Sequence, residues 1–215
     1  IDSLLVEINQ HLSTYISDSE INTFNMDQSN NPFSASPQLL EVVNESLKYY
    51  KLSDGSFDIT VQPLVQAWGF SSEYKKMKFL DIKLIDSLLL LTGSDKILIR
   101  GSSIYKDNSF VQIDVSAIAK GWGVDQVSKL LNSLGITNYM IEIGGEIFVS
   151  GGNENNDKWE IGVRFPDGNN SALLSTIHVS NQAVATSGVY QNYYTIEDVN
   201  YSHLIDPKTG YPVRH

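Results

Sequence analysis

The order in which helical and strand patterns occur is the feature that most limits the folds open to this chain. Apolar residues recur at helical spacing early in the sequence, whereas alternating patterns are concentrated after residue 139. The two kinds of pattern do not alternate regularly, so a doubly wound parallel sheet is not expected. The order instead predicts an α+β fold in which mainly antiparallel sheets are flanked by helices.

Helices are expected where apolar residues recur at helical spacing and a capping residue marks an end. Ser36 followed by Pro37 is such a start, because serine caps a helix well and proline suits the first helical position. Gly135 is the expected C-cap of a later helix. We expect helices at residues 1–12, 37–51, 63–69, 81–91 and 124–134.

Strands are expected where apolar residues alternate or form short runs between turn residues. Residues 97–99 and 109–115 are predicted to be strands on either side of a loop at 101–108. Residues 139–149 are predicted to form two strands separated by a glycine pair. Further strands are expected at 159–164, 173–179 and 183–186.

The stretch from Tyr201 to Pro212 has the residue types of a reactive site. His203 could move protons near neutral pH, and Asp206 follows three residues later, where a carboxylate could orient the imidazole or hold a cation. The sequence Asp-Pro-Lys-Thr-Gly is also typical of a turn, because proline restricts φ and glycine accepts a positive φ. The stretch alone is therefore compatible with a catalytic site or with a simple turn.

Three glycine-containing segments could let a ligand approach the backbone. The segment 114–123 places Lys120 where a strand is expected to meet a helix, and free N–H groups at such a junction can bind an anion. Gly144, Gly145 and the segment 185–188 offer backbone without side-chain obstruction. Close helix–sheet packing or tight hairpins would use the same residues. Common P-loop, serine hydrolase and zincin motifs are absent from the sequence.

Charge and composition exclude some classes of partner. The formal net charge of −10 argues against nucleic-acid binding, and it means that a bound anion would need a metal ion or helix N-termini. The chain has no cysteine and no run of 18 apolar residues, so neither a disulfide nor a transmembrane segment is expected. It enters a helical pattern at once without an initial methionine. We therefore expect a trimmed segment whose targeting sequence is not seen.

Five segments taken together resemble the ApbE family, the FAD:protein FMN transferases. They occur in the order and approximate spacing of that family and extend over nearly the whole chain, and the stretch 15–25 is also similar to its N-terminal region. The resemblance implies a single ApbE-like, T-fold-like domain over residues 1–215. The five segments are 57–70, 117–121, 143–145, 185–188 and 202–212.

The resemblance also implies a reaction and a site. Members of the family use a magnesium ion to split FAD at its pyrophosphate and transfer FMN to a Ser or Thr hydroxyl of an acceptor protein, releasing AMP. By resemblance, His203 assists removal of the proton from the attacking hydroxyl, and the carbonyl of Ala117 is a magnesium ligand. The residues that would contact FAD are Tyr15, Ser56, Phe57, Asp58, Asp114, Lys120 and Ile205.

Two segments of the family have no counterpart in this chain, so we expect a domain shortened at both ends. One is a first strand before Ile1, and the other is a later Asp-x-x-x-Thr segment that supplies two magnesium ligands. Asp206 and Thr209 are spaced differently and belong to the turn. The alternatives are a non-catalytic FAD-binding protein and an FAD pyrophosphatase that yields FMN and AMP.

The resemblance implies a partner and a cellular location as well. The expected partner is a membrane-associated redox protein that carries an acceptor Thr or Ser. The expected location is the periplasmic side of a bacterial cell envelope, where a longer gene product could carry a lipoprotein signal.

Overall fold

The structure is a computed structural model that describes residues 1–70, 80–165, 173–188, 193–196 and 199–213. The chain forms two compact units. The larger unit comprises Val6–Ile118 and Tyr193–His215, and the smaller unit comprises Ile1–Leu5 and Ala119–Asn192.

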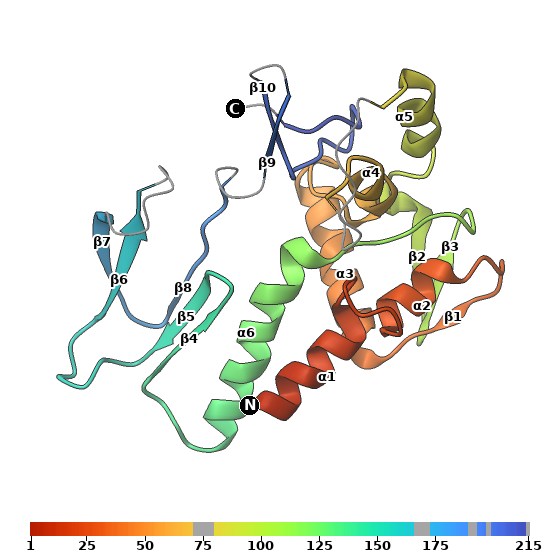
Figure 1. The fold of residues 1–215 in the computed structure, drawn as a ribbon. Helices are drawn as coiled ribbons and strands as arrows, with labels where there is room; N and C mark the ends of the chain where they lie inside the picture. The colour runs from red at the N-terminus through yellow and green to blue at the C-terminus, as the bar shows by residue number, and fades with distance from the viewer. Residues whose placement is uncertain (71–79, 166–172, 189–192, 197–198, 214–215) are drawn as a thin grey trace. The chain divides into compact units, whose positions relative to one another are not determined.

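All strand pairs in the described residues are antiparallel, and helices make up much of the chain, so the predicted α+β class is confirmed (Figure 1). The sheets are small, with orders β1-β3-β2, β10-β9, β4-β5-β8 and β6-β7. The α-helices are α1 (Asp2–Leu12), α2 (Glu20–Met26), α3 (Pro37–Leu52), α4 (Gln62–Ala67), α5 (Ile82–Leu89) and α6 (Ser116–Ser133). The short 3₁₀ helices are η1 (Ile59–Val61) and η2 (Ser94–Lys96). The strands are β1 (Phe33–Ser34), β2 (Ile97–Arg100), β3 (Ser103–Lys106), β4 (Tyr139–Ile143), β5 (Glu146–Ser150), β6 (Trp159–Arg164), β7 (Leu173–Val179), β8 (Gln182–Val184), β9 (Tyr193–Ile196) and β10 (Val199–Ser202).

Side-chain caps begin the main helices of the larger unit. The Ser36 hydroxyl accepts the N–H of Leu39 at 3.2 Å, which confirms the predicted start of α3. Ser19 caps α2 in the same way. Helix α2 was not predicted, because its seven residues show too little of a helical period. Each cap satisfies an N–H that the helix itself leaves unpaired.

The predicted strand at 109–115 is wrong, although Val111, Ile113 and Val115 are fully buried. The partner of β2 is β3, because the chain turns at Gly101 and pairs Arg100 with Ser103, within the stretch predicted as a loop. The buried segment is instead bonded to the amide of Asn25. That amide donates to the Ile113 carbonyl and accepts from the Ile113 N–H, both at 2.8 Å. The Asn25 side chain thus makes the two backbone hydrogen bonds that a neighbouring strand would otherwise make to Ile113.

An apolar cluster of the larger unit joins α4, α5 and the C-terminal turn. Leu64, Trp68 and Ile85 are buried at its centre, and Ile205 packs against them. Gly210 closes against the same cluster with φ +74°. This packing brings the C-terminal segment onto helices that lie far from it in the sequence.

The smaller unit is built on α6 and the hairpin of β4 and β5. Buried Val124 and Val127 of the helix pack against Tyr139 and Ile141 of β4. Gly144 and Gly145 turn the hairpin with φ values of +56° and +92°, which confirms the predicted strand pair. The predicted strands at 159–164 and 173–179 are also present as β6 and β7. No helix within the described ranges is long and apolar enough to cross a bilayer.

Gly210→Ala should lower the free energy of unfolding by about 3 kcal/mol. The loss has two causes, because alanine is strained in a left-handed conformation and its methyl group would overpack the cluster. A Cβ at this buried position would lie 2.7 Å from Ile85 Cγ2. Gly101→Ala is the matched control, because Gly101 also has a positive φ but an added Cβ would meet nothing within 4 Å. The control should cost only about 1 kcal/mol. Equal losses in urea denaturation would contradict the packing described here.

Candidate functional site

The segment that carries His203 is a narrow hairpin that follows β10. The buried hydroxyl of Ser202 donates to the Val213 carbonyl at 3.0 Å, and the Val213 N–H donates to the Leu204 carbonyl at 2.8 Å. Ile205 forms a β-bridge with Pro212 further along the hairpin. His203 is half-buried at the base of this hairpin. Its backbone position is therefore set by bonds on both sides.

The Asp-Pro-Lys-Thr-Gly sequence forms the turn at the tip of this hairpin. Asp206 accepts the N–H of Lys208 at 2.8 Å and the hydroxyl of Thr209 at 3.0 Å, and its carbonyl accepts the Gly210 N–H at 2.8 Å. Both carboxylate oxygens thus serve the turn. These contacts support a structural role for Asp206 in the turn.

Trp68 holds this turn in place. Its indole N–H donates to the Gly210 carbonyl at 2.8 Å, and the indole is almost completely buried. The ring stacks on Tyr201 at 6.5 Å between centroids and tilts against Tyr211 at 5.7 Å. Ile205, a predicted FAD contact, is half-buried and packs on the apolar cluster around Trp68.

The carboxylate of Asp58 is the centre of a hydrogen-bond network. It accepts the N–H and hydroxyl of Thr60 at 2.8 and 2.6 Å, and the N–H and hydroxyl of Ser94 at 3.2 and 2.6 Å. Thr60 and Ser94 are fully buried. Asp58 therefore stabilises the backbone of its own loop. The neighbouring Ser56 is exposed and Phe57 is half-buried, and their contact with FAD stays a prediction.

Two contacts connect the Phe57 loop to its surroundings. The Phe57 ring meets Tyr49 edge-on, with centroids 6.0 Å apart. Lys208 Nζ lies 3.2 Å from the Asp54 carboxylate, so the C-terminal turn and this loop are neighbours. Both partners of that ion pair are exposed, and such pairs add little stability.

Asp114 lies directly beside the Asp58 loop. Its N–H donates to the Ile59 carbonyl at 2.7 Å, and its carboxylate accepts the N–H of Ser116 at 2.8 Å. This second bond orders the chain just before α6. The predicted residues Asp58 and Asp114 are thus brought together through Ile59, one residue from Asp58.

Ala117 is exposed in the first turn of α6. A carbonyl in a helix keeps a second lone pair, and magnesium prefers oxygen ligands. The described part of the chain contains no group of three or more Asp, Glu, His or Cys residues that could hold a metal ion. The Ala117 carbonyl is the magnesium ligand predicted among the described residues.

Lys120 belongs to the smaller unit and faces the β4–β5 hairpin. Its ammonium lies 2.8 Å from the Glu146 carboxylate and donates to the Gly144 carbonyl at 3.1 Å. Lys120 of the segment 114–123 is therefore in contact with Gly144 of the glycine pair, as neither segment alone could predict. Glu146 was not predicted as a site residue, although its position directly after the glycine pair could have indicated it. Lys120 is nearly half exposed, so its ammonium is accessible to solvent as well.

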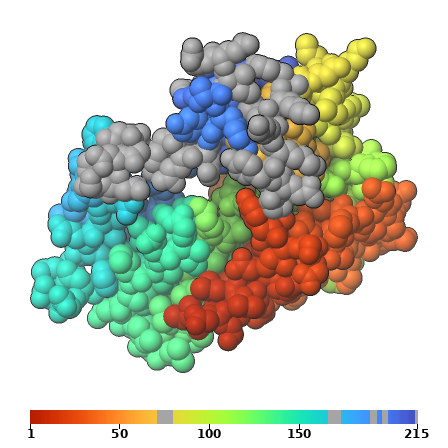
Figure 2. Space-filling model, viewed as in Figure 1, coloured from red at the N-terminus to blue at the C-terminus, as the bar shows by residue number. Residues whose placement is uncertain are grey.

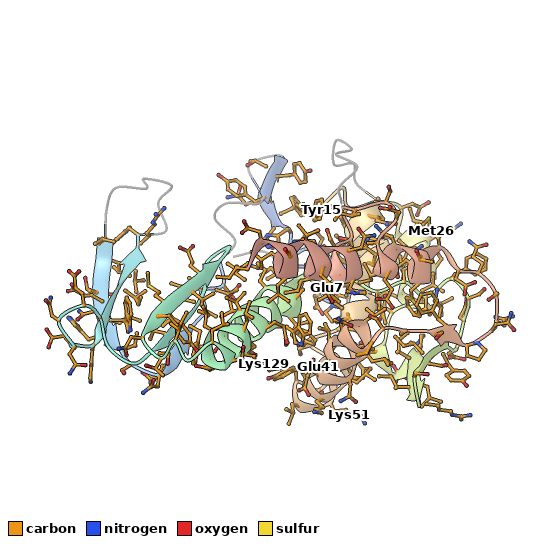
Figure 3. All side chains as sticks on the ribbon, turned by 90° about the horizontal axis from the view of Figure 1, so that it is seen from below. Glu7, Tyr15, Met26, Glu41, Lys51 and Lys129 are labelled. Carbon is orange, nitrogen blue, oxygen red and sulfur yellow. The ribbon has the colours of Figure 1, made fainter. Side chains whose placement is uncertain are left out.

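Tyr15 lies in the connection between α1 and α2 (Figure 3). Its side chain is 69% exposed, a large value for an aromatic ring. The N-terminal segment, red in the space-filling view, is exposed on the face shown (Figure 2). Tyr15 can therefore be reached by a ligand from solvent.

Comparisons with known proteins agree with these motifs. The model of the ApbE family matches residues 1–215. An FAD:protein FMN transferase of Vibrio cholerae is 41% identical over 215 residues, which are 100% of this chain and 64% of that protein. The corresponding protein of Haemophilus influenzae is 36% identical, again over 100% of this chain and 64% of that protein. The chain thus spans a little under two thirds of these relatives.

Solved structures give the same result for the fold. The structure titled flavin transferase ApbE from Vibrio cholerae has a TM-score of 0.89 and 40% identity, covering 100% of this chain and 68% of that one. The apo form of Pseudomonas stutzeri flavinyl transferase ApbE has a TM-score of 0.90 and 31% identity, covering 100% of this chain and 66% of that one. With the family match over its whole length, the chain belongs to the ApbE family.

Proposed function

We propose that this protein is a flavin transferase that splits FAD, attaches FMN to a Thr or Ser hydroxyl of an acceptor protein and releases AMP. One observation carries the proposal. Three segments that are far apart in the sequence meet in the larger unit: residues 56–70, the stretch around Asp114, and the hairpin 202–213. The Asp114–Ile59 and Trp68–Gly210 hydrogen bonds join them. These segments hold most of the predicted FAD contacts together with His203. The relatives named FAD:protein FMN transferase support the same function.

The proposed reaction is a displacement at phosphorus. The acceptor oxygen attacks the phosphorus of the FMN half while the P–O bond to AMP breaks, and the hydroxyl proton passes to His203. Histidine suits this role because it exchanges protons near neutral pH. The bonds within its hairpin fix the backbone that carries the imidazole, and a fixed backbone favours alignment for such a transfer.

Magnesium dependence is part of the proposal on charge grounds. FAD carries a negatively charged pyrophosphate, and the chain has a formal net charge of −10. A bound magnesium ion would neutralise part of that charge and polarise the reacting phosphate. The Ala117 carbonyl would supply one oxygen ligand of the kind that magnesium prefers.

The partner and location complete the proposal. The acceptor would be a membrane-associated redox protein on the periplasmic side of a bacterial cell envelope. The support is the family resemblance and the bacterial source of the relatives. A second candidate is a non-catalytic FAD-binding protein that would use the same FAD contacts without transferring FMN.

Incubation of the chain with FAD, magnesium and an acceptor protein carrying a Thr in an exposed loop tests the proposal. We expect AMP by chromatography and an acceptor heavier by one FMN by mass spectrometry. EDTA should abolish both products. AMP without modified acceptor would favour an FAD pyrophosphatase, whereas FAD binding without AMP would favour the non-catalytic protein.

His203→Ala should lower the rate of FMN transfer by about 100-fold or more, the usual effect of losing a general base. The Kd for FAD should change by less than about threefold, because the proposed role is proton transfer. His178→Ala is the control, since His178 is an exposed histidine of β7 paired with Glu160 at 3.3 Å. Equal losses of rate and affinity in His203→Ala would contradict the assigned role.

A further inference from the structure

The loop that carries Tyr15 is unusually well ordered for a surface connection. The Asn22 side-chain amide donates to the carbonyls of Thr14 and Ile16, at 3.0 and 2.8 Å. These two residues lie immediately before and after Tyr15. Bonds to both flanking residues restrict the backbone dihedrals of Tyr15 itself.

Further bonds close the same loop at its ends. His11 Nδ1 in the last turn of α1 lies 2.6 Å from Glu20 Oε2 in the first turn of α2. The Gln10 amide donates to the Asp18 carbonyl at 2.9 Å. The loop is therefore closed between the two helices.

Glu20 and Asn22 also connect the loop to the helices around it. Glu20 accepts the N–H of Ser36 at 2.6 Å, which ties the first turn of α2 to the N-cap of α3. The N–H of Asn22 donates to the capping Ser19 hydroxyl at 3.2 Å, while its side chain reaches back over the loop. Asn22 is thus fixed by the helix and in turn fixes the loop.

This order does not serve the burial of Tyr15, whose ring is 69% exposed. An exposed aromatic ring on a restrained backbone is well suited to a planar ligand, because the backbone loses little conformational freedom on binding. The ring system of flavin is such a ligand. The arrangement around Tyr15 therefore has the properties of a preformed stacking platform.

We infer that Asn22 is a positioning residue that holds Tyr15 ready to stack on the flavin of FAD. The inference rests on the proposed function, because it assumes that FAD is the ligand. Asn22 itself need not touch FAD. Its effect passes through the carbonyls of Thr14 and Ile16 to the ring of Tyr15.

A double-mutant cycle with FAD titration by calorimetry tests the inference. Asn22→Ala should weaken FAD binding by about tenfold, since two hydrogen bonds that order the loop are lost. Tyr15→Ala should weaken binding at least as much. In the double variant, Asn22→Ala should cause no further loss, because the ring that it positions is gone. Emission of the bound flavin should rise in both single variants, since a stacked tyrosine quenches it.

Thr23→Val is the matched control. The Thr23 hydroxyl also bonds a backbone carbonyl, that of Ser19 at 3.0 Å, but not the residues flanking Tyr15. Thr23→Val should change the affinity for FAD by less than about twofold, because Thr23 is exposed. If Asn22→Ala does not fold, Asn22→Asp replaces it, because aspartate keeps the size, suits the first turn of a helix and cannot donate.

Two outcomes would overturn the inference, and they are distinguishable. Additive losses in the double variant would mean that Asn22 acts independently of Tyr15, while FAD binding by the unaltered chain would leave the proposed function intact. Failure of the unaltered chain to bind FAD at all would remove the proposed function and the inference with it.

Discussion

The hydrogen bond from the Trp68 indole to the Gly210 carbonyl is the interaction on which the candidate site most depends. It joins two residues that are 142 positions apart and lies in a buried setting. A buried indole N–H without a partner would be costly, so the bond favours one position of the C-terminal turn. His203 and Ile205 are carried by the hairpin that this turn closes. Their placement therefore follows from a contact that neither of them makes.

Side-chain hydrogen bonds to the backbone are the common means by which this protein orders its loops. The sheets have only two or three strands among the described residues, so they leave many segments without a neighbouring strand. Asn25 takes the place of such a strand beside Ile113, and Asp58 orders the loop before η1. Because the candidate site is made of loops, these polar side chains determine its geometry more than the sheets do.

Local signals in the sequence predicted the elements that depend on local chemistry. The Ser36 cap predicted the start of α3, and the glycine pair predicted the hairpin of β4 and β5. The segment 109–115 was wrongly predicted to be a strand, because its apolar alternation reports burial and not the identity of its bonding partner. That partner is a side chain far away in the sequence.

The candidate site shows the same difference between what local motifs predict and what depends on distant partners. The family motifs named Asp58, Asp114, His203 and Ile205, and the structure shows where each lies. Their partners could not be derived from spacing: Ser94 reaches Asp58 from another part of the chain, as Glu146 reaches Lys120, a further predicted FAD contact. The assignment of these residues to FAD remains a prediction from the resemblance.

Comparison of Trp68→Phe with Trp159→Phe would test the central claim most directly. Both indoles donate to a backbone carbonyl, at 2.8 Å to Gly210 and at 3.0 Å to Ser150, but only Trp68 holds the hairpin of His203. Trp68→Phe should lower the rate of AMP release from FAD by about tenfold or more, because His203, the proposed proton acceptor, would lose its alignment. Trp159→Phe should leave that rate unchanged. Equal rates in the two variants would contradict the dependence of the site on the Trp68 bond.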